Sequence, residues 1–367
     1  MRIELPISKS IANRLLILQA IHGDGLATVS ACGVPDDVLL LHCALTTLRT
    51  FKTSKTLSTP HIDVGNCGTA MRFLTAYCAQ LAGQTTILDG VERMHHRPIG
   101  QLVDALREIG ADIEYLGEEG FPPLRIMGKA LDKSKPITLN QPQSTQFVSA
   151  LLLIGANVQT DSTPPYITLT REMIKNKEQG TKNKDKLLTT NQTQVTNLGS
   201  LLLAPYSEIE RDWSSAAFWY EYVALHGGEI TLPGLSRDSL QGDKVVADIF
   251  AHLGVLTTHT AEGVVISSSP LHSTPFTLHH DFSACPDLYP AVALTCERLG
   301  ITLHATGVES LPIKESDRLR AVREHRTDAD HRMAMALLIA GYEVDNTACI
   351  SKSYPQFLEH FRQLRKK

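Results

Sequence analysis

The chain has 367 residues, of which 43% are hydrophobic and 20% are charged, and its formal net charge is −4. A chain of this length favours about two domains. No run of about 18 apolar residues occurs, so no membrane-spanning helix is expected. The small negative charge provides no global field that would hold nucleic acid or an anionic membrane, so any anion site must be local.

The N-terminus and the cysteines indicate a cytoplasmic protein. The opening segment, MRIELPISKS, reads as a strand and has neither the apolar core of a signal peptide nor the pattern of a transit peptide. The seven cysteines are odd in number and form no CxxC pair, which argues against a disulfide framework and against a structural zinc site. Most of them are expected to be small core residues.

The stretch from Asp63 to Gly100 is the most informative part of the chain. A tight turn at Gly65–Thr69 opens a run whose apolar residues recur at helical spacing over 70–81. A glycine-rich helix start exposes backbone N–H groups and therefore attracts anions. A short strand is expected at 85–88, and residues 93–98 are expected to start a second helix with two arginines. Taken alone, the stretch is better explained by a helix cap with surface charges.

A second candidate anion site lies near the N-terminus. Ser10 is a plausible N-cap of a helix over 11–21, and Arg14 lies one turn further along the same face. Lys9, Ser10 and Arg14 could therefore converge on one anionic group. On this segment alone, a capped helix with solvated charges is the stronger interpretation.

The remaining chain alternates helices and strands. Residues 167–173 are predicted as a strand or a helix, and the polar stretch 175–200 as a long hairpin or a mobile loop. Charged and hydroxyl residues recur at helix starts, which could be gathered toward a common cleft. Helices are further expected at 38–48, 99–109, 147–154, 216–225, 245–252 and 288–299, and strands at 111–115, 124–127, 255–259 and 264–267.

An internal repeat predicts the fold class. The order helix, glycine, strand, turn, strand occurs at 99–127 and again at 245–267. This favours an α/β protein built from repeated units over a single Rossmann sheet, because no GxGxxG follows a strand. A change of composition near Arg211 predicts an N-terminal lobe over 7–211 and a C-terminal lobe over 212–367, the latter completed by a strand at 1–6.

Nine blocks of the sequence are informative when they are taken together: SKSIANR (8–14), GNCGTAMR (65–72), residues 92–111, STQF (144–147), DWSSA, SLQGD, CPD, IKESDRLRA (313–321) and DHRMAM (330–335). Together they resemble the 5-enolpyruvylshikimate-3-phosphate synthase (3-phosphoshikimate 1-carboxyvinyltransferase) family of enolpyruvyl transferases. The match is collinear from Lys9 to Pro355. It implies a two-domain inside-out α/β barrel made of repeated βαβαββ units, in which the enolpyruvyl group of phosphoenolpyruvate is transferred to the 5-hydroxyl of shikimate 3-phosphate.

The resemblance also implies the residues that bind each substrate. Arginine suits both substrates because its planar fork binds carboxylate and phosphate through two hydrogen bonds. For shikimate 3-phosphate the implied residues are Lys9, Ser10, Arg14, Ser144, Thr145, Gln146, Thr163, Asp287 and Lys314. For phosphoenolpyruvate they are Lys9, Gly68, Arg97, Gln146, Arg318, Arg332 and Lys352.

The chemistry requires a base for the 5-hydroxyl and an acid for the methylene carbon of phosphoenolpyruvate. The resemblance implies Lys9, Asp287 and Glu315 for these proton transfers, with His331 nearby. Taken singly, Asp287 and Glu315 are better explained as a helix cap and a surface ion pair. The resemblance implies no cofactor, no metal ion, no nucleic acid and no membrane, and a monomer is expected.

The chain departs from the family pattern most strongly after Arg320. Only nine residues separate Arg320 from Asp330, where the repeat requires a helix end and two strands. Either the chain takes a natural shortcut or the sequence omits residues; the second hypothesis is favoured, because a lost hairpin would leave sheet edges and core uncovered. Smaller departures are Cys67 and Phe73 beside the Gly68 turn, Thr145 for a usual serine, and Pro164 for a common basic residue.

Two rival functions remain. A sister enolpyruvyl transferase acts on a UDP-amino sugar and carries a catalytic cysteine in a glycine-rich loop. Cys67 lies in the Gly68 turn and not in the corresponding loop after Arg93, so the shikimate enzyme fits better. The other rival is a non-catalytic sugar-phosphate binding protein, which the shortened region makes conceivable.

Overall fold

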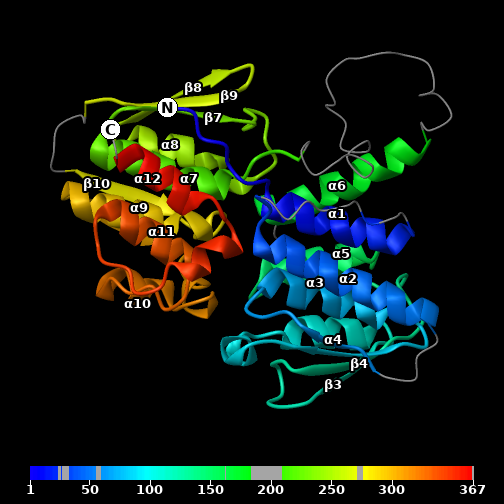
Figure 1. Cartoon of the computed structure of the whole chain (residues 1–367). Helices are drawn as coiled ribbons and strands as arrows, with labels where there is room; N and C mark the ends of the chain where they lie inside the picture. The colour runs from blue at the N-terminus through cyan, green and yellow to red at the C-terminus, as the bar shows by residue number, and fades with distance from the viewer. Residues whose placement is uncertain are drawn as a thin grey trace. The chain divides into compact units, whose positions relative to one another are not determined.

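The computed structural model describes residues 1–23, 26, 33–54, 59–161, 163–182, 209–270 and 276–365. The chain forms two compact units (Figure 1). The N-terminal unit comprises the described residues of Ser10–Val29 and Asp37–Ile209. The C-terminal unit comprises the described residues of Met1–Lys9, Ser30–Asp36 and Glu210–Lys367. The architecture is therefore mixed α/β with residues 1–9 belonging to the second unit.

The N-terminal unit combines helices with a four-stranded sheet in the order β1-β2-β4-β3. Strand β1 is parallel to β2, whereas β4 is antiparallel to both β2 and β3. A separate parallel pair is formed by β5 and β6. The elements are α1 (Lys9–His22), α2 (Asp36–Ser54), β1 (His61–Asp63), α3 (Gly68–Ala79), β2 (Thr85–Asp89), the 3-10 helix η1 (Glu92–His96), α4 (Gly100–Glu108), β3 (Asp112–Tyr115), β4 (Leu124–Met127), β5 (Ile137–Thr138), α5 (Thr145–Leu153), β6 (Val158–Gln159) and α6 (Pro165–Lys182).

Helix α3 is the central element of the N-terminal unit. It contacts β2 and β4 of the sheet as well as α4 and α5, and nearly every residue in it is buried. A helix that is apolar all round can only be stable when it is covered on every side. The start of α3 is fixed by the preceding turn, in which Val64 N donates to Asp89 O at 2.9 Å and Gly65 N donates to Asp63 Oδ1 at 2.7 Å.

The C-terminal unit contains a three-stranded antiparallel sheet, β7-β9-β8, and a parallel pair, β10-β11. Arg2 extends the first sheet through an isolated parallel bridge to Thr231. The elements are α7 (Trp213–His226), β7 (Glu229–Pro233), η4 (Gly242–Val245), α8 (Val246–Ala251), β8 (Val255–Thr260), β9 (Gly263–Ser268), β10 (Thr277–Asp281), η5 (Pro286–Leu288), α9 (Tyr289–Leu299), β11 (Thr302–Thr306), η6 (Leu311–Ile313), α10 (Arg318–Glu324), α11 (His331–Ala340), η7 (Ala348–Lys352) and α12 (Phe357–Arg365).

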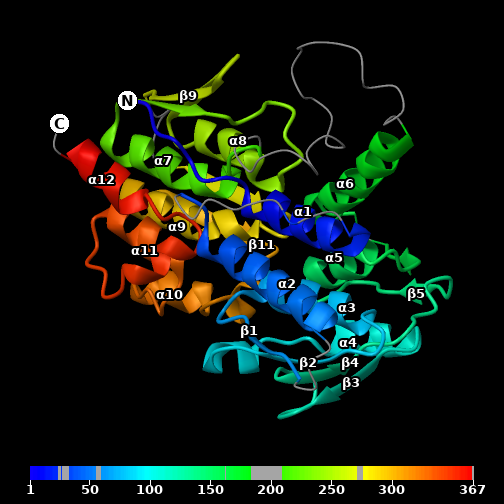
Figure 2. The same cartoon turned by 45° about the vertical axis from the view of Figure 1, so that its right-hand side comes forward.

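The core of the C-terminal unit lies where α7, α9 and α11 pack against one another (Figure 2). Trp219 of α7 is fully buried, and its indole Nε1 donates to the hydroxyl of Tyr354 at 3.1 Å. This bond satisfies the only polar atom of a large buried side chain. Among the described residues, no helix is both long and apolar enough to cross a membrane.

Several local predictions need correction. Helix α1 begins at Lys9, so Ser10 lies in the first turn and is not the N-cap. Residues 93–98 do not start a continuous helix: η1 ends before Arg97, and α4 begins at Gly100. The stretch predicted as a loop from residue 175 is helical up to Lys182, and residues 183–200 lie outside the described residues. For residues 167–173, predicted as a strand or a helix, the helix alternative is confirmed, because they belong to α6.

The chain joins α10 directly to α11 without an intervening strand. Residues 321–330 are all described, and the connection turns sharply through three non-glycine residues with positive φ, His325 (51°), Asp328 (46°) and Ala329 (56°). Such values are uncommon outside glycine and mark a tight turn. The strand pair that the repeat required at this point is therefore absent from residues 321–330.

Candidate active site

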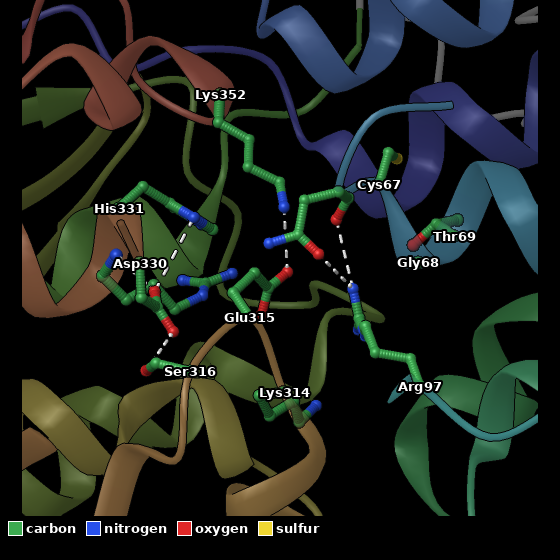
Figure 3. A network of polar contacts seen from close by, with 12 residues as sticks. Cys67, Gly68, Thr69, Arg97, Lys314, Glu315, Ser316, Asp330, His331 and Lys352 are labelled. Carbon is green, nitrogen blue, oxygen red and sulfur yellow. Dashed lines mark hydrogen bonds and ion pairs between the residues drawn. The ribbon is translucent and has the colours of Figure 1, made fainter. Parts of the chain in front are cut away.

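In the N-terminal unit, the start of α3 forms a cationic turn (Figure 3). Cys67 is the N-cap, and its Sγ accepts a hydrogen bond from Ala70 N at 3.4 Å. A Cβ added at Gly68 would lie 2.5 Å from Nη2 and 2.8 Å from Cζ of Arg97. Only glycine leaves room for this guanidinium, so the turn and Arg97 form one local site.

Arg97 is held beside the turn by the backbone and the side chain of Asn66. Its Nη1 donates to Asn66 O at 3.1 Å and to Asn66 Oδ1 at 3.4 Å, and the side chain is buried. The buried Arg72 of α3 lies on the other side of the same segment, with Nη2 donating to Pro98 O at 2.8 Å and Nη1 donating to Gly68 O at 3.3 Å. Two arginines thus place positive charge at a helix N-terminus, where the helix dipole also favours an anion.

The start of α5 is connected to the start of α3. Ser144 is the N-cap of α5, and its Oγ accepts from Gln146 N at 3.3 Å. Gln146 Nε2 donates to Thr69 Oγ1 at 3.1 Å. Thr145 lies in the first turn of α5, whereas Thr163 is exposed before α6. The structure therefore brings Gln146 to the cationic turn, and it presents Thr163 on the surface.

Arg14 lies inside the N-terminal unit with no exposed surface. Its guanidinium donates to the backbone oxygens of Ser10 (2.7 Å) and Tyr166 (2.9 Å) and to Thr170 Oγ1 (2.7 Å). The ring of Tyr166 stacks on the guanidinium at 3.9 Å. Burial lowers the pKa of Arg14, against the opposing effect of Tyr166. Ser10 and Arg14 are thus neighbours, as predicted, but the contact between them is a hydrogen bond from the Arg14 guanidinium to the Ser10 carbonyl oxygen.

In the C-terminal unit, Arg318 is the centre of an ionic network. The side chain is 1% exposed and contacts three carboxylates. These are Asp287 Oδ1 at 2.7 Å, Asp330 Oδ2 at 2.8 Å and Glu315 Oε2 at 3.0 Å. Although burial lowers the pKa of Arg318, the three carboxylates raise it above its ordinary value. The network fixes the positions of two predicted proton-transfer residues.

Asp287 is surrounded by cations. Arg332 Nη2 lies 2.8 Å from Oδ2, and Lys314 Nζ lies 3.7 Å from Oδ1. Burial raises the pKa of Asp287, but Arg332, Lys314 and Arg318 together hold it well below its usual range. Asp287 is therefore a carboxylate at neutral pH. Burial and the charge of Asp287 raise the pKa of a second carboxyl, Asp243, to about 6.

Glu315 and His331 occupy different electrostatic environments (Figure 3). Glu315 Oε1 lies 3.2 Å from Lys352 Nζ. His331 is buried, and among the described residues neither of its ring nitrogens has a hydrogen-bond partner; Nδ1 lies 3.8 Å from Asp330 Oδ1. Burial, Lys9 and Arg332 lower the pKa of His331 well below its usual range. His331 is therefore neutral at physiological pH.

The structure adds residues that the sequence did not single out. Asp330 is fully buried, accepts from Arg318 and Ser316, and caps α11 by accepting from Arg332 N at 2.9 Å. Its position as the acidic first residue of the DHRMAM run, immediately before helix α11, was the signal that could have indicated it. Arg72 gave no comparable signal in the sequence, because an arginine in an otherwise apolar helix usually extends its guanidinium into solvent. Within the described ranges, no cluster of three His, Cys, Asp or Glu side chains could hold a metal ion.

Comparisons with known proteins identify the family of the chain. The sequence model of the family "EPSP synthase (3-phosphoshikimate 1-carboxyvinyltransferase)" matches residues 1–325 and 322–361. A 3-phosphoshikimate 1-carboxyvinyltransferase of Bacteroides fragilis is 36% identical over 409 residues, covering 98% of this chain and 94% of the relative. The corresponding protein of Ralstonia nicotianae is 31% identical over 425 residues, covering 98% and 95%.

A solved structure titled as EPSP synthase from Acinetobacter baumannii shares the fold, with a TM-score of 0.63, 18% identity and coverage of 99% of this chain and 95% of that chain. The alignment with the Bacteroides relative, at 409 positions, is longer than the 367-residue chain, so the relative has residues without a counterpart here. The two family matches meet at 322–325, where α10 passes directly to α11. The chain belongs to the EPSP synthase family.

Proposed function

We propose that this chain carries out the reaction of its family. It transfers the enolpyruvyl group of phosphoenolpyruvate to the 5-hydroxyl of shikimate 3-phosphate and releases phosphate, a step of aromatic amino-acid biosynthesis. The observation that carries this function is the family match over nearly the whole chain, together with 36% identity to a named 3-phosphoshikimate 1-carboxyvinyltransferase. The ionic network around Arg318 and the cationic turn beside Gly68 supply groups suited to anionic substrates.

For phosphoenolpyruvate, we assign the cationic turn and four further cationic side chains. The N-terminus of α3 and the guanidinium of Arg97 offer N–H donors to a phosphate or carboxylate oxygen. Gln146 is hydrogen-bonded to the same turn. The proposed set is Lys9, Gly68, Arg97, Gln146, Arg318, Arg332 and Lys352.

For shikimate 3-phosphate, we assign hydroxyl, amide and charged groups. Ser144 and Thr145 lie at the start of α5, where the helix dipole favours a phosphate. Asp287 is an ionised acceptor suited to ring hydroxyl groups. The proposed set is Lys9, Ser10, Arg14, Ser144, Thr145, Gln146, Thr163, Asp287 and Lys314.

The proton transfers are assigned to Lys9, Asp287, Glu315 and His331. A base removes the proton of the 5-hydroxyl while the oxygen attacks C2 of phosphoenolpyruvate, and an acid protonates the methylene carbon. The tetrahedral intermediate then loses phosphate, and the methyl group gives up a proton to restore the double bond. Glu315 lies between Lys352 and Arg318, a position that suits a group that exchanges a proton beside fixed positive charge. A positioned acid or base contributes about 10² to 10⁴ in rate.

The finer architecture is also a proposal. We propose that each unit is an inside-out α/β barrel of repeated βαβαββ elements, with lobes over 7–211 and 212–367 completed by residues 1–6. The helix–strand–strand order of α4-β3-β4 and of α8-β8-β9 supports it. The protein is proposed to be a cytoplasmic monomer that binds neither nucleic acid nor membranes.

Phosphate release distinguishes the candidate functions. The purified chain is incubated with phosphoenolpyruvate and either shikimate 3-phosphate or a UDP-amino sugar. Release with shikimate 3-phosphate supports the proposal, and release only with the UDP-amino sugar supports the sister transferase. Binding without release would indicate a non-catalytic binder, a candidate favoured by the missing strands between α10 and α11.

Two variants test the assigned roles. Arg97→Ala should raise KM for phosphoenolpyruvate more than KM for shikimate 3-phosphate; an equal effect on both removes Arg97 from the phosphoenolpyruvate set.

Glu315→Gln should leave both affinities nearly intact and reduce kcat by roughly 10²-fold or more. A variant with wild-type kcat would exclude Glu315 from proton transfer.

A further inference from the structure

The short 3-10 helix η1 is connected to the end of strand β2 by a hydrogen bond between the side chains of His95 and Asp89. His95 Nε2 donates to Asp89 Oδ1 at 2.8 Å, and the same oxygen accepts from Gly90 N at 2.7 Å. His61 Nε2 lies 3.5 Å from the other oxygen, Oδ2. Burial raises the pKa of Asp89, but the bonds from His95 and Gly90 hold it below its ordinary value. Asp89 is therefore an ionised acceptor, and His95 is held by a charge-assisted hydrogen bond.

The backbone of η1 carries this restraint to Arg97. Met94 N donates to Val91 O at 2.7 Å, and Arg97 N donates to Met94 O at 3.0 Å, so Arg97 is the C-cap of η1. Val91 N also donates to Gly65 O at 3.2 Å, which joins η1 to the turn before α3. A change in the orientation of η1 therefore changes where the guanidinium of Arg97 lies relative to Gly68.

The segment from the end of β2 to Pro98, which contains η1 and Arg97, is restrained at its two ends by different elements. Arg72 of α3 holds the far end through the Pro98 carbonyl oxygen at 2.8 Å. The near end has the Asp89–His95 bond to β2. His95 also has Glu92 Oε2 at 3.7 Å from Nδ1, but the Glu92 side chain is 84% exposed. The bond to Asp89 is the shorter and the more buried of the two.

We infer that His95, held by Asp89, is a positioning residue for Arg97 and thereby for phosphoenolpyruvate. This inference rests on the proposed role of Arg97 in binding phosphoenolpyruvate. His95 itself touches no substrate in this scheme. It acts by fixing the angle at which η1 leaves β2 and thereby the position of the Arg97 guanidinium. This position matters because a small displacement of a binding group can greatly weaken its interaction with the substrate.

The next residue provides a matched control. His96 lies in the same 3-10 helix, and its Nε2 lies 3.2 Å from Glu92 Oε1. Both side chains are exposed, 60% for His96 and 84% for Glu92, so this contact contributes little. His96 also belongs to neither proposed substrate set. A His96→Leu substitution therefore removes a histidine from η1 without removing the connection to β2.

The experiment measures steady-state phosphate release, varying each substrate at saturation of the other. His95→Leu should raise KM for phosphoenolpyruvate roughly fivefold, the equivalent of one lost hydrogen bond. KM for shikimate 3-phosphate and kcat should stay unchanged. His95→Gln should restore most of the affinity, because its amide N–H can donate to Asp89. His96→Leu should behave like the wild type.

Other outcomes overturn the inference. An unchanged KM for phosphoenolpyruvate in His95→Leu, or an equal rise in both KM values, shows that His95 does not position Arg97. If His95→Leu does not fold, Asp89→Asn replaces it and should raise the same KM alone. Arg97→Ala is measured in parallel: if it leaves KM for phosphoenolpyruvate unchanged, the proposed role of Arg97 fails and the inference fails with it. If Arg97→Ala raises that KM and His95→Leu does not, only the inference fails.

Discussion

Arg14 in the N-terminal unit and Arg318 in the C-terminal unit are equally buried but differently neutralised. Arg14 has no exposed surface, and Arg318 has 1%. Arg14 donates to carbonyl and hydroxyl oxygens and lies under the Tyr166 ring, whereas Arg318 contacts three carboxylates. Burial accordingly lowers the pKa of Arg14, while the carboxylates raise that of Arg318 above its ordinary value.

The two arginines differ in how their positive charge is compensated. A buried cation needs compensation by an opposite charge or by several oriented dipoles. Arg318 receives opposite charge from Asp287, Glu315 and Asp330, and in return it fixes their positions. In the described part of the chain, no ion pair compensates Arg14. Oriented dipoles of the Ser10 and Tyr166 carbonyl groups and of the Thr170 hydroxyl group compensate it instead. The following four substitutions test this contrast, together with the proposed role of Arg14 in binding shikimate 3-phosphate.

The largest effect is expected for Arg318→Leu. It leaves Asp330, which has no exposed surface, as a buried charge without its main partner. The free energy of unfolding should fall by about 3–5 kcal/mol, measured by urea denaturation. Arg320→Leu in the same helix is the control, because Arg320 and Glu324 are 60% and 40% exposed and should contribute at most about 1 kcal/mol. Equal losses in both variants would show that the network is not structural.

Arg14→Met should affect binding more than stability. It leaves only neutral acceptors unpaired, so the free energy of unfolding should fall by about 1–2 kcal/mol. The affinity for shikimate 3-phosphate, measured by calorimetry, should fall at least roughly tenfold. Arg107→Met is the control, because Arg107 also stacks on a tyrosine (Tyr115, 5.1 Å) and donates to a backbone oxygen (Ile113, 2.6 Å). Unchanged affinity in Arg14→Met would remove Arg14 from the binding set.

Glu221 is a buried acid for which, as for Arg14, burial shifts the pKa toward the neutral form. Its carboxyl group has no exposed surface and, among the described residues, no hydrogen-bond partner, and burial raises its pKa well above the ordinary value. The folded state therefore retains a proton that the unfolded state loses as the pH rises. The contribution of Glu221 to stability should be fully present below the ordinary glutamate pKa and should fall as the pH rises toward the folded-state pKa.

Glu221→Leu should therefore become progressively more stable than the wild type with rising pH. The difference should grow by up to about 1.4 kcal/mol per pH unit until the folded-state pKa is reached. Urea denaturation between pH 5 and pH 9 measures it. Glu309→Gln, at an exposed position, should show a flat difference. A flat difference for Glu221→Leu as well would show that the carboxyl group is charged and compensated in the folded protein.

The smallest effect is expected for Thr170→Val. The hydroxyl of Thr170 accepts from Arg14 Nε at 2.7 Å and lies 2.9 Å from Ser149 Oγ. Its removal should lower the free energy of unfolding by about 1 kcal/mol. Thr168→Val in the same helix is the control, since Thr168 is exposed and its hydroxyl donates to the Thr163 backbone oxygen at 3.3 Å. A larger fall in the free energy of unfolding for Thr168→Val than for Thr170→Val would show that the hydrogen bond between Arg14 and the Thr170 hydroxyl does not stabilise the fold.

Local patterns were predicted well where their causes are local. The strand 124–127 was predicted with the bounds observed for β4, and the helix expected at 216–225 lies within α7. Hydrophobic period, glycine at helix ends and acidic N-caps act over a few residues, so they are readable in the sequence. The break at Arg97 was missed, because it depends on Asn66 and Gly68, about thirty positions earlier in the chain.

The amino-acid sequence by itself determined the family, the α/β class and the helix starts at which charged residues gather, since these follow from motifs and local periodicity. Only the tertiary structure decided which charges compensate one another. It joined Arg318 to Asp287 across 31 positions and Arg14 to Thr170 across 156. Burial and long-range pairing set the electrostatic role of an arginine, and neither is visible in the residues beside it.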